Sequence, residues 1–168
     1  MPPLTAKDIM IRSVISVFPD TPLTEAACTL AEHHFDGVPV VDRENTLVGI
    51  LTEYDLVSKT STIHLPTFQK ILQELSLHKQ DSAKFQKDFQ EILSLKAEDV
   101  MNRDPLTLAP EAMFEEVVAA FRDHHRVNPI PVVDKDHKVV GIISRFDVFK
   151  PLEFLSSLSP NERKQSQL

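Results

Sequence analysis

The architecture of this chain is decided by the stretch Val139-Val140-Gly141-Ile142-Ile143-Ser144-Arg145-Phe146-Asp147. It has the pattern of a buried strand that leads into a hydroxyl residue and, three positions later, a carboxylate. The chain contains the pattern twice, because Leu47-Val48-Gly49-Ile50-Leu51-Thr52-Glu53-Tyr54-Asp55 has the same order of residue types. We therefore expect a protein built from two related halves.

The repeat extends on both sides of this stretch. Ala6-Lys7-Asp8-Ile9-Met10 returns as Ala97-Glu98-Asp99-Val100-Met101, and Pro39-Val40-Val41-Asp42 returns as Pro131-Val132-Val133-Asp134. No glycine-rich phosphate loop accompanies the repeat, since the chain has only three glycines. This composition argues against kinase-like and dinucleotide-dependent enzymes.

Each copy shows the same succession of elements. In the first copy, a short extended segment (14–18) precedes a helix that begins at Pro22 and carries Leu23, Ala26, Ala27 and Leu30 on one face. Two apolar segments (38–41 and 47–51) separated by polar residues predict a hairpin, and a second short helix begins at Thr52. The second copy repeats this order, with its last helix beginning at Ser144. The predicted fold is mixed α/β, with two β-α-β-β-α repeats.

The sequence divides into four regions. Residues 1–57 form the first repeat, 58–96 a linker, 97–158 the second repeat and 159–168 a flexible tail. Apolar residues at helical spacing after Pro66 and again after Ser82 predict an inserted helical hairpin in the linker. We expect this hairpin to serve as an output surface, a dimer surface or a passive brace.

Composition limits the partners and the compartment. The chain of 168 residues is 42% hydrophobic and carries a formal net charge of −7. Such an acidic chain is not expected to bind the backbone of a nucleic acid. Without a secretion signal or a long apolar run, it is expected to be cytoplasmic and not in a membrane. The single cysteine, Cys28, lies among apolar helical positions, so we expect a buried structural thiol.

The repeated residues resemble the CBS domain, named after cystathionine β-synthase, and two copies resemble the tandem pair called a Bateman module. The resemblance is carried by Asp8-Ile9-Met10, by Gly37-Val38-Pro39-Val40-Val41-Asp42, by their counterparts in the second copy and by the two glycine-to-aspartate stretches. It implies two copies packed with pseudo-twofold symmetry around two clefts. It further implies that the clefts bind adenine nucleotides or adenosyl compounds, and that the protein forms a homodimer.

Each copy offers residues suited to a nucleotide. Thr52 and Ser144 lie where a strand passes into a helix, so a hydroxyl and free N–H groups can face a phosphate. Asp55 and Asp147 can accept two hydrogen bonds from a ribose diol. The expected ligand-binding set is Ser144, Arg145, Asp147, Ile130, Pro131, Leu106 and Arg126 in the second copy, and Thr52, Asp55, Val38, Pro39 and Val14 in the first.

The hydroxyl and the carboxylate of each copy can also be interpreted without a ligand. Thr52 with Asp55, and Ser144 with Asp147, fit a helix capping box in which they only satisfy backbone N–H groups. The residue after each hydroxyl differs, since Arg145 is cationic and Glu53 is anionic. We therefore expect a di- or triphosphate to prefer the second copy, while the first suits adenosine or an adenosyl cation or stays empty. Loss of nucleotide-induced stabilisation in Asp147→Ala but not in Asp55→Ala would agree with this asymmetry.

Two functions of different kinds follow from the sequence. The first is a regulatory module that senses adenosine-containing ligands and signals to an unknown protein target by conformational change, with no obligatory cofactor. The alternative is a ligand-free structural or interaction protein acting through its helical hairpin and dimer surface. An enzyme is not expected, because no general base or metal site stands out. The adjacent histidines (33–34 and 124–125) point about 100° apart on a helix, which does not fit a metal site.

Overall fold

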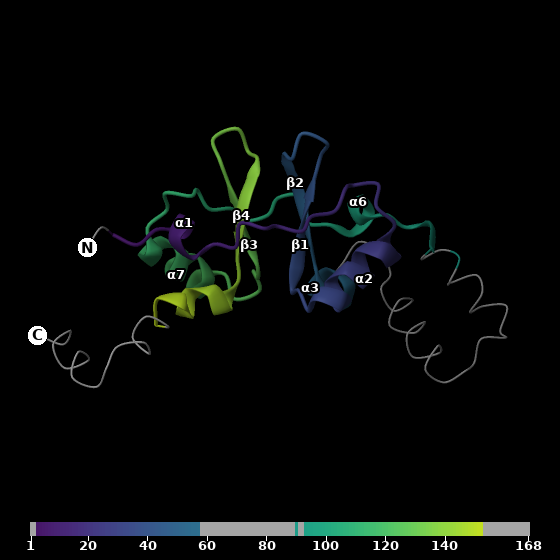
Figure 1. Cartoon of the computed structure of the whole chain (residues 1–168). Coiled ribbons are helices and arrows are strands. Elements are labelled where there is room, and N and C mark those ends of the chain that lie inside the picture. Colours follow the sequence, from purple (N-terminus) through teal and green to yellow (C-terminus); the bar gives the residue numbers. More distant parts are fainter. Residues whose placement is uncertain (1–2, 58–89, 91–92, 153–168) are drawn as a thin grey trace, which may run out of the picture. The chain divides into compact units, whose positions relative to one another are not determined.

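The computed structural model describes residues 3–57, 90 and 93–152 (Figure 1). The described elements, in chain order, are α1 (Ala6–Ile9), α2 (Leu23–His33), β1 (Gly37–Val41), β2 (Leu47–Thr52), α3 (Glu53–Val57), α6 (Ala97–Val100), α7 (Phe114–Asp123), β3 (Ile130–Val133), β4 (Val139–Ile143) and the 3₁₀ helix η1 (Arg145–Phe149). The helical hairpin expected within residues 58–96 and the tail from 159 fall outside the described residues, except that residues 90 and 93–96 are described.

The chain forms two compact units, each with its own hydrophobic core. The first, called here the N-repeat unit, comprises Ile15–Pro105 and Asp136–Val139. The second, the C-repeat unit, comprises Met1–Val14, Leu106–Lys135 and Val140–Leu168. Each unit therefore combines most of one sequence repeat with the first segment of the other repeat, and the N-repeat unit also includes Asp136–Val139 of the second repeat.

The sheet of the N-repeat unit is built on the β1–β2 hairpin. The two strands are antiparallel, with Val38 opposite Leu51 and an irregularity between Val40 and Val41. Val17 adds a parallel bridge to Val40 on one side, and Asn102 adds an antiparallel bridge to Ile50 on the other. All five residues of β1 are buried, as expected for a short apolar strand covered on both faces.

The C-repeat unit repeats this arrangement. Strands β3 and β4 form its sheet, Leu108 bridges Val132 in parallel and Ile11 bridges Ile142 in antiparallel fashion. Its core contains residues of α7, β3 and β4 together with Ala6 and Ile9 of the N-terminal segment. The predicted helix, hairpin and final helix are found in both copies, whereas the predicted first strand is reduced to an isolated bridge, at Val17 and at Leu108. The last element differs, because α3 is an α-helix whereas η1 is a 3₁₀ helix.

The first segment of each repeat is exchanged between the two units. Helix α1 opens the first repeat but lies beside β4 and α7, and α6 opens the second repeat but lies beside β1 and β2 (Figure 1). Backbone hydrogen bonds anchor both, including Ala6 N–H to the carbonyl of Ala112 at 2.8 Å and Ala97 N–H to the carbonyl of Thr21 at 2.9 Å. The sequence repeats did not predict this exchange.

The glycine of each repeated stretch is explained by the exchanged segment. A Cβ at Gly49 would lie 2.7 Å from Met101 Sδ and 2.8 Å from the carbonyl oxygen of Asn102. A Cβ at Gly141 would collide with Met10, whose Cγ would be 2.8 Å away. Glycine is favoured because the exchanged segment approaches the strand closely, through the backbone of Asn102 at Gly49 and through the side chain of Met10 at Gly141.

The aspartates of the repeated Asp-Ile-Met and Asp-Val-Met segments cap the exchanged helices. Asp8 Oδ2 accepts hydrogen bonds from the Thr5 hydroxyl at 2.7 Å and the Thr5 N–H at 2.8 Å. The side-chain bond from Thr5 is the main cause of a lowered pKa of Asp8. Asp99 Oδ2 accepts the N–H of Lys96 at 2.8 Å. These aspartates satisfy the first turn of a helix, which explains their place in the motif.

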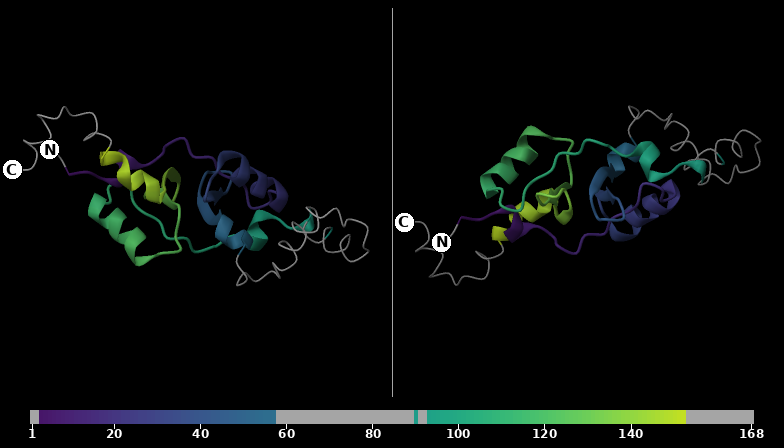
Figure 2. Two further views of the ribbon diagram at one scale, coloured as in Figure 1. Left: turned by 90° about the horizontal axis from the view of Figure 1, so that it is seen from below. Right: turned by 90° about the horizontal axis from the view of Figure 1, so that it is seen from above.

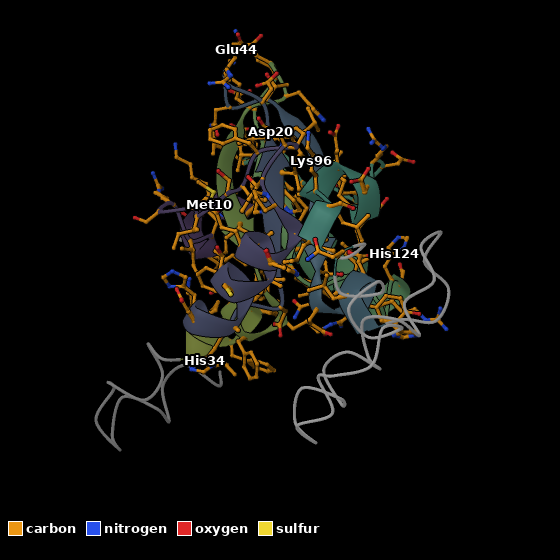
Figure 3. All side chains as sticks on the ribbon, turned by 90° about the vertical axis from the view of Figure 1, so that its right-hand side faces the viewer. Met10, Asp20, His34, Glu44, Lys96 and His124 are labelled. Atoms are coloured by element: carbon orange, nitrogen blue, oxygen red, sulfur yellow. The ribbon has the colours of Figure 1, made fainter. Side chains whose placement is uncertain are left out.

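The β1–β2 hairpin is closed by a carboxylate. Asp42 Oδ1 accepts the N–H of Thr46 at 2.7 Å and of Glu44 at 3.0 Å. The bond from Thr46 is the main cause of a lowered pKa of Asp42. Glu44 lies at the tip of the hairpin (Figure 3). A short polar side chain of this kind is typical of a turn because it replaces a backbone acceptor.

The expectation of a buried cysteine is wrong. Cys28 is exposed on α2, whose buried residues are Leu23, Ala26 and Leu30. Cys28 lies two residues from both Ala26 and Leu30, whereas buried positions on a helix recur at three or four residues. The apolar neighbourhood in sequence was therefore misleading, because the thiol lies off the buried stripe.

Candidate functional site

The carboxylate of the second repeat lies at the corner between β4 and η1. Asp147 Oδ2 accepts hydrogen bonds from the Ser144 N–H at 2.6 Å and the Ser144 hydroxyl at 2.8 Å. Asp147 is 5% exposed and is the one buried polar or charged residue in the described part of the chain. A buried carboxylate must be compensated by donors or by a cation. At this corner both kinds of partner are present.

The cation at this corner is Lys150. Its Nζ lies 2.8 Å from Asp147 Oδ1, the oxygen that Ser144 does not use. The same Nζ donates a hydrogen bond to the carbonyl of Ile9, the last residue of α1, at 2.6 Å. The Lys150 side chain is 37% exposed, against 7% for that of Asp147. Lys150 was not among the expected site residues, although it stands three positions after Asp147, a spacing at which helical side chains meet.

Arg145 braces the end of α7. Its guanidinium donates hydrogen bonds to the carbonyls of Phe121 at 3.0 Å, His124 at 3.0 Å and His125 at 2.9 Å. Its Cζ lies 5.1 Å from the centre of the Phe121 ring. The last carbonyls of a helix have no partner within the helix, and a guanidinium is well placed to satisfy several of them. The charge expected to face a phosphate is therefore directed at a helix end.

The brace extends to the backbone beside Ser144. The Arg145 N–H donates to Asn128 Oδ1 at 2.9 Å, and a further guanidinium contact reaches the carbonyl of Val127 at 3.3 Å. Helix α7 and η1 lie side by side in both views of Figure 2. Arg145 thus fixes the loop 124–128 against the corner that holds Asp147.

The first repeat forms a similar corner in the N-repeat unit. Asp55 Oδ2 accepts the Thr52 N–H at 2.8 Å and the Thr52 hydroxyl at 2.6 Å. Asp55 is only half-buried, and Glu53 is exposed. Within the described ranges, no ion pair is found at Asp55. The capping geometry is therefore shared by the two repeats, whereas the ion pair with a lysine, Lys150, is found at the corner of the second repeat.

The expected wall residues are mostly buried. Val38, Pro39, Ile130 and Pro131 are fully buried within their units, and Leu106 is half-buried. These positions contribute to the hydrophobic cores, so contact with an adenine ring stays a prediction.

The remaining expected residues are Arg126 and Val14. Arg126 is exposed, and Val14 is the last residue of the N-terminal segment that packs in the C-repeat unit. All seven residues expected in the second copy belong to the C-repeat unit. The set for the first copy is divided, because Val14 belongs to the C-repeat unit and the others to the N-repeat unit.

A separate pocket in the N-repeat unit has the wrong charge for a phosphate. It has a volume of about 290 Å³ and is lined by Phe18, Pro19, Asp20, Asp42, Arg43 and Glu98. Three carboxylates against one guanidinium would repel an anionic ligand. None of the expected ligand-binding residues lines this pocket.

Comparison with known protein families identifies the family to which the repeats belong. The CBS domain family matches residues 6–61 and 97–153, which together make up more than half of the chain. This chain belongs to the CBS domain family. Its two matches cover both copies of the repeated stretch, so it is a tandem CBS pair.

Related proteins agree with this assignment. The uncharacterized protein MJ1426 of Methanocaldococcus jannaschii is 28% identical over 87% of this chain and 89% of its own length. The crystal structure of the CBS-pair protein CBSX2 from Arabidopsis thaliana has a TM-score of 0.70 and 25% identity, covering 94% of this chain and 99% of that one. A CBSX2 structure in complex with AMP has a TM-score of 0.66 and 25% identity over 90% of this chain and 98% of that one.

Some relatives are enzymes in which the similarity is confined to one part. Inosine-5′-monophosphate dehydrogenase of M. jannaschii is 29% identical over 86% of this chain but only 23% of the enzyme. The match therefore corresponds to a CBS part and does not indicate dehydrogenase activity in this chain. In the described residues, no helix has the length and apolar character needed to cross a membrane.

Proposed function

We propose that this CBS pair is a regulatory module that binds an adenosine-containing ligand, AMP, ADP, ATP or S-adenosylmethionine, and signals by conformational change. The observation that supports this function best is the Ser144–Asp147 corner, where a buried carboxylate stands at the end of a strand. A similar CBS-pair protein binds AMP in its crystal structure.

The corner has the chemistry that a ribose requires. An ionised carboxylate accepts two hydrogen bonds, and vicinal hydroxyls donate two in a matching geometry. The Ser144 hydroxyl already donates to Asp147, which leaves its lone pairs for a further donor. Both groups are held by backbone contacts and the η1 turn, so little ordering is needed when a ligand binds.

Signalling requires that the ligand bind one conformation more tightly than another. We propose that this difference is expressed in the arrangement of the two units or of a homodimer, and that it is transmitted to a protein target. The proposed absence of nucleic-acid backbone binding accords with the net charge of −7, and a cytoplasmic location stays a proposal.

Thermal shift and titration calorimetry with AMP, ADP, ATP and S-adenosylmethionine test the function. A ligand at 100 times its Kd raises the free energy of unfolding by about 2.7 kcal/mol. We expect at least one ligand to stabilise the wild type and Asp147→Asn to lose that response. The matched control is Asp55→Asn, which changes the first-repeat corner and should retain it.

One result of these binding measurements would contradict the proposed function. A folded wild type that responds to none of these ligands would show that the clefts are unused. The chain would then be a structural or interaction protein that acts through its surfaces.

A further inference from the structure

The lysine at the second-repeat corner occupies the acceptor that a ribose would need. Asp147 has two oxygens, of which Oδ2 is bonded to Ser144 and Oδ1 to Lys150. Oδ2 already accepts two hydrogen bonds from Ser144, so the two hydroxyls of a ribose must both use Oδ1 and take it from the ammonium group. Binding at this corner is therefore an exchange, in which a charged partner of a buried carboxylate is replaced by neutral hydroxyls.

We infer that Lys150 is a specificity-determining residue that makes this corner select adenosine ligands carrying a phosphate over the uncharged nucleoside. The inference rests on the proposed binding of adenosine compounds. An uncharged nucleoside displaces Lys150 and gives it no new partner. A phosphorylated nucleoside offers an anion to the released ammonium, so the lost ion pair is replaced by another.

The geometry allows Lys150 to change partners. Its side chain is partly exposed, and a lysine carries a compact charge on a flexible four-carbon stem. Its second contact, to the carbonyl of Ile9, is a single hydrogen bond to one end of α1. The η1 segment and α1 lie side by side in both views of Figure 2. The ammonium can therefore leave Asp147 without loss of the surrounding core.

Arg145 is less suited to this role. Its guanidinium contacts four carbonyls and the Phe121 ring, which fix it in one direction. Moving it to a phosphate would leave the end of α7 without those donors. We therefore assign the phosphate-binding role to Lys150 instead of Arg145. Arg145 positions the loop 124–128.

The first repeat provides a natural comparison. Ser58 stands three positions after Asp55, where the second repeat has Lys150 three positions after Asp147. Serine carries no charge, so this position supplies no cation that a phosphate could bind. The Asp55 corner should consequently show no preference for phosphorylated over unphosphorylated adenosine.

The test compares AMP with adenosine by titration calorimetry. All variants carry Asp55→Asn, so that only the second-repeat corner is measured. With Lys150 present, we expect AMP to bind at least about tenfold more tightly than adenosine, because a charge-assisted bond to phosphate is formed. Lys150→Met should bring the two affinities within about threefold of one another, and Lys150→Arg should restore most of the preference.

Each contrary outcome has a distinct meaning. An unchanged ratio of AMP to adenosine affinity in Lys150→Met would overturn the inference, including when both ligands weaken equally through loss of the contact to Ile9. So would a protein with Lys150 that binds the two ligands equally. Failure of the folded wild type to bind any adenosine compound would instead overturn the proposed function, and the inference with it. Circular dichroism and the melting temperature of each variant establish that it is folded.

Discussion

Gly49→Ala should destabilise the N-repeat unit, because the added methyl group has no space. Its Cβ would lie 2.8 Å from the carbonyl oxygen of Asn102 and 2.7 Å from Met101 Sδ. The Asn102 carbonyl accepts the Ile50 N–H at 2.9 Å, and the Asn102 N–H donates back to Ile50 at 2.9 Å. The methyl group can be accommodated only by loosening this closed pair of hydrogen bonds.

The magnitude follows from these contacts. Overpacking in a core costs about 1–3 kcal/mol, and each weakened backbone hydrogen bond adds up to about 1 kcal/mol. The lower entropy of an unfolded chain with alanine offsets about 0.4–1 kcal/mol. We expect Gly49→Ala to lower the free energy of unfolding by about 2–3 kcal/mol. A chain of this size should then melt about 4–12 °C lower.

Gly141→Ala is the matched variant and should cost less. The three atoms nearest to its added Cβ all belong to the side chain of Met10, which is flexible. We expect a loss of about 1–2 kcal/mol, partly relieved when Met10→Ala is added.

Urea denaturation followed by circular dichroism measures these differences. Gly49→Ala within about 0.5 kcal/mol of wild type would refute the close approach of the exchanged segment. If Gly141→Ala and Met10→Ala changed the free energy of unfolding in a strictly additive way, the close approach of the exchanged segment in the C-repeat unit would be refuted.

Other predictions concern single side chains. Arg145→Lys should destabilise the protein nearly as much as Arg145→Ala, by about 1–3 kcal/mol in urea denaturation, because an ammonium cannot reach several carbonyls at once; a Lys variant as stable as wild type would contradict this. The pKa values of Asp8 and Asp42 are lowered in the folded protein, so the stability they contribute is present above their usual value of 3.8 and is lost as the pH falls through the lowered values. Acid denaturation of Asp42→Asn should accordingly show a smaller loss of stability on acidification than wild type, and identical curves would contradict it. Cys28 should react with iodoacetamide in the folded protein at a rate close to that in urea, and full protection would show that it is covered.

Sequence patterns predicted the local elements because those elements depend on neighbouring residues. Strands β1 and β2 follow from two apolar segments around a polar turn, where Asp42 accepts the N–H of Thr46. Helix α2 begins just after Pro22, as its fixed φ favours. Such signals need no knowledge of the rest of the fold. The hairpin signal is also present in the second copy, where β3 and β4 form, whereas α7 begins after Met113 and has no such proline.

The exchange of α1 and α6 could not be predicted in the same way. A glycine within a strand indicates the close approach of another backbone, and this signal was present at Gly49 and Gly141. The identity of the approaching segment depends on long-range packing, which a single sequence does not contain. Each repeat taken alone would place its Asp-Ile-Met or Asp-Val-Met segment in its own core, whereas Ile9 and Met101 pack in the core of the other unit.

The candidate site shows why a local motif is insufficient evidence for binding. At both corners the N–H group of Thr52 or Ser144 bonds to the carboxylate three positions later, as in a capping box, and the hydroxyl donates a further bond to the same oxygen. A cap alone does not require burial or a cation. Asp147 is buried and pairs with Lys150, whereas Asp55 is half-buried and has Ser58 at the matching position.

Burying a charged pair is costly, and a hydrophobic replacement is often at least as stable. The ion pair at Asp147 is therefore poorly explained by stability alone. It is better explained if the carboxylate must stay ionised and exchange its partner for a ligand. If stability were its only purpose, Asp147→Leu with Lys150→Met would bind AMP with unchanged affinity, whatever the stability of the variant. We expect the double variant to be folded and unable to bind AMP.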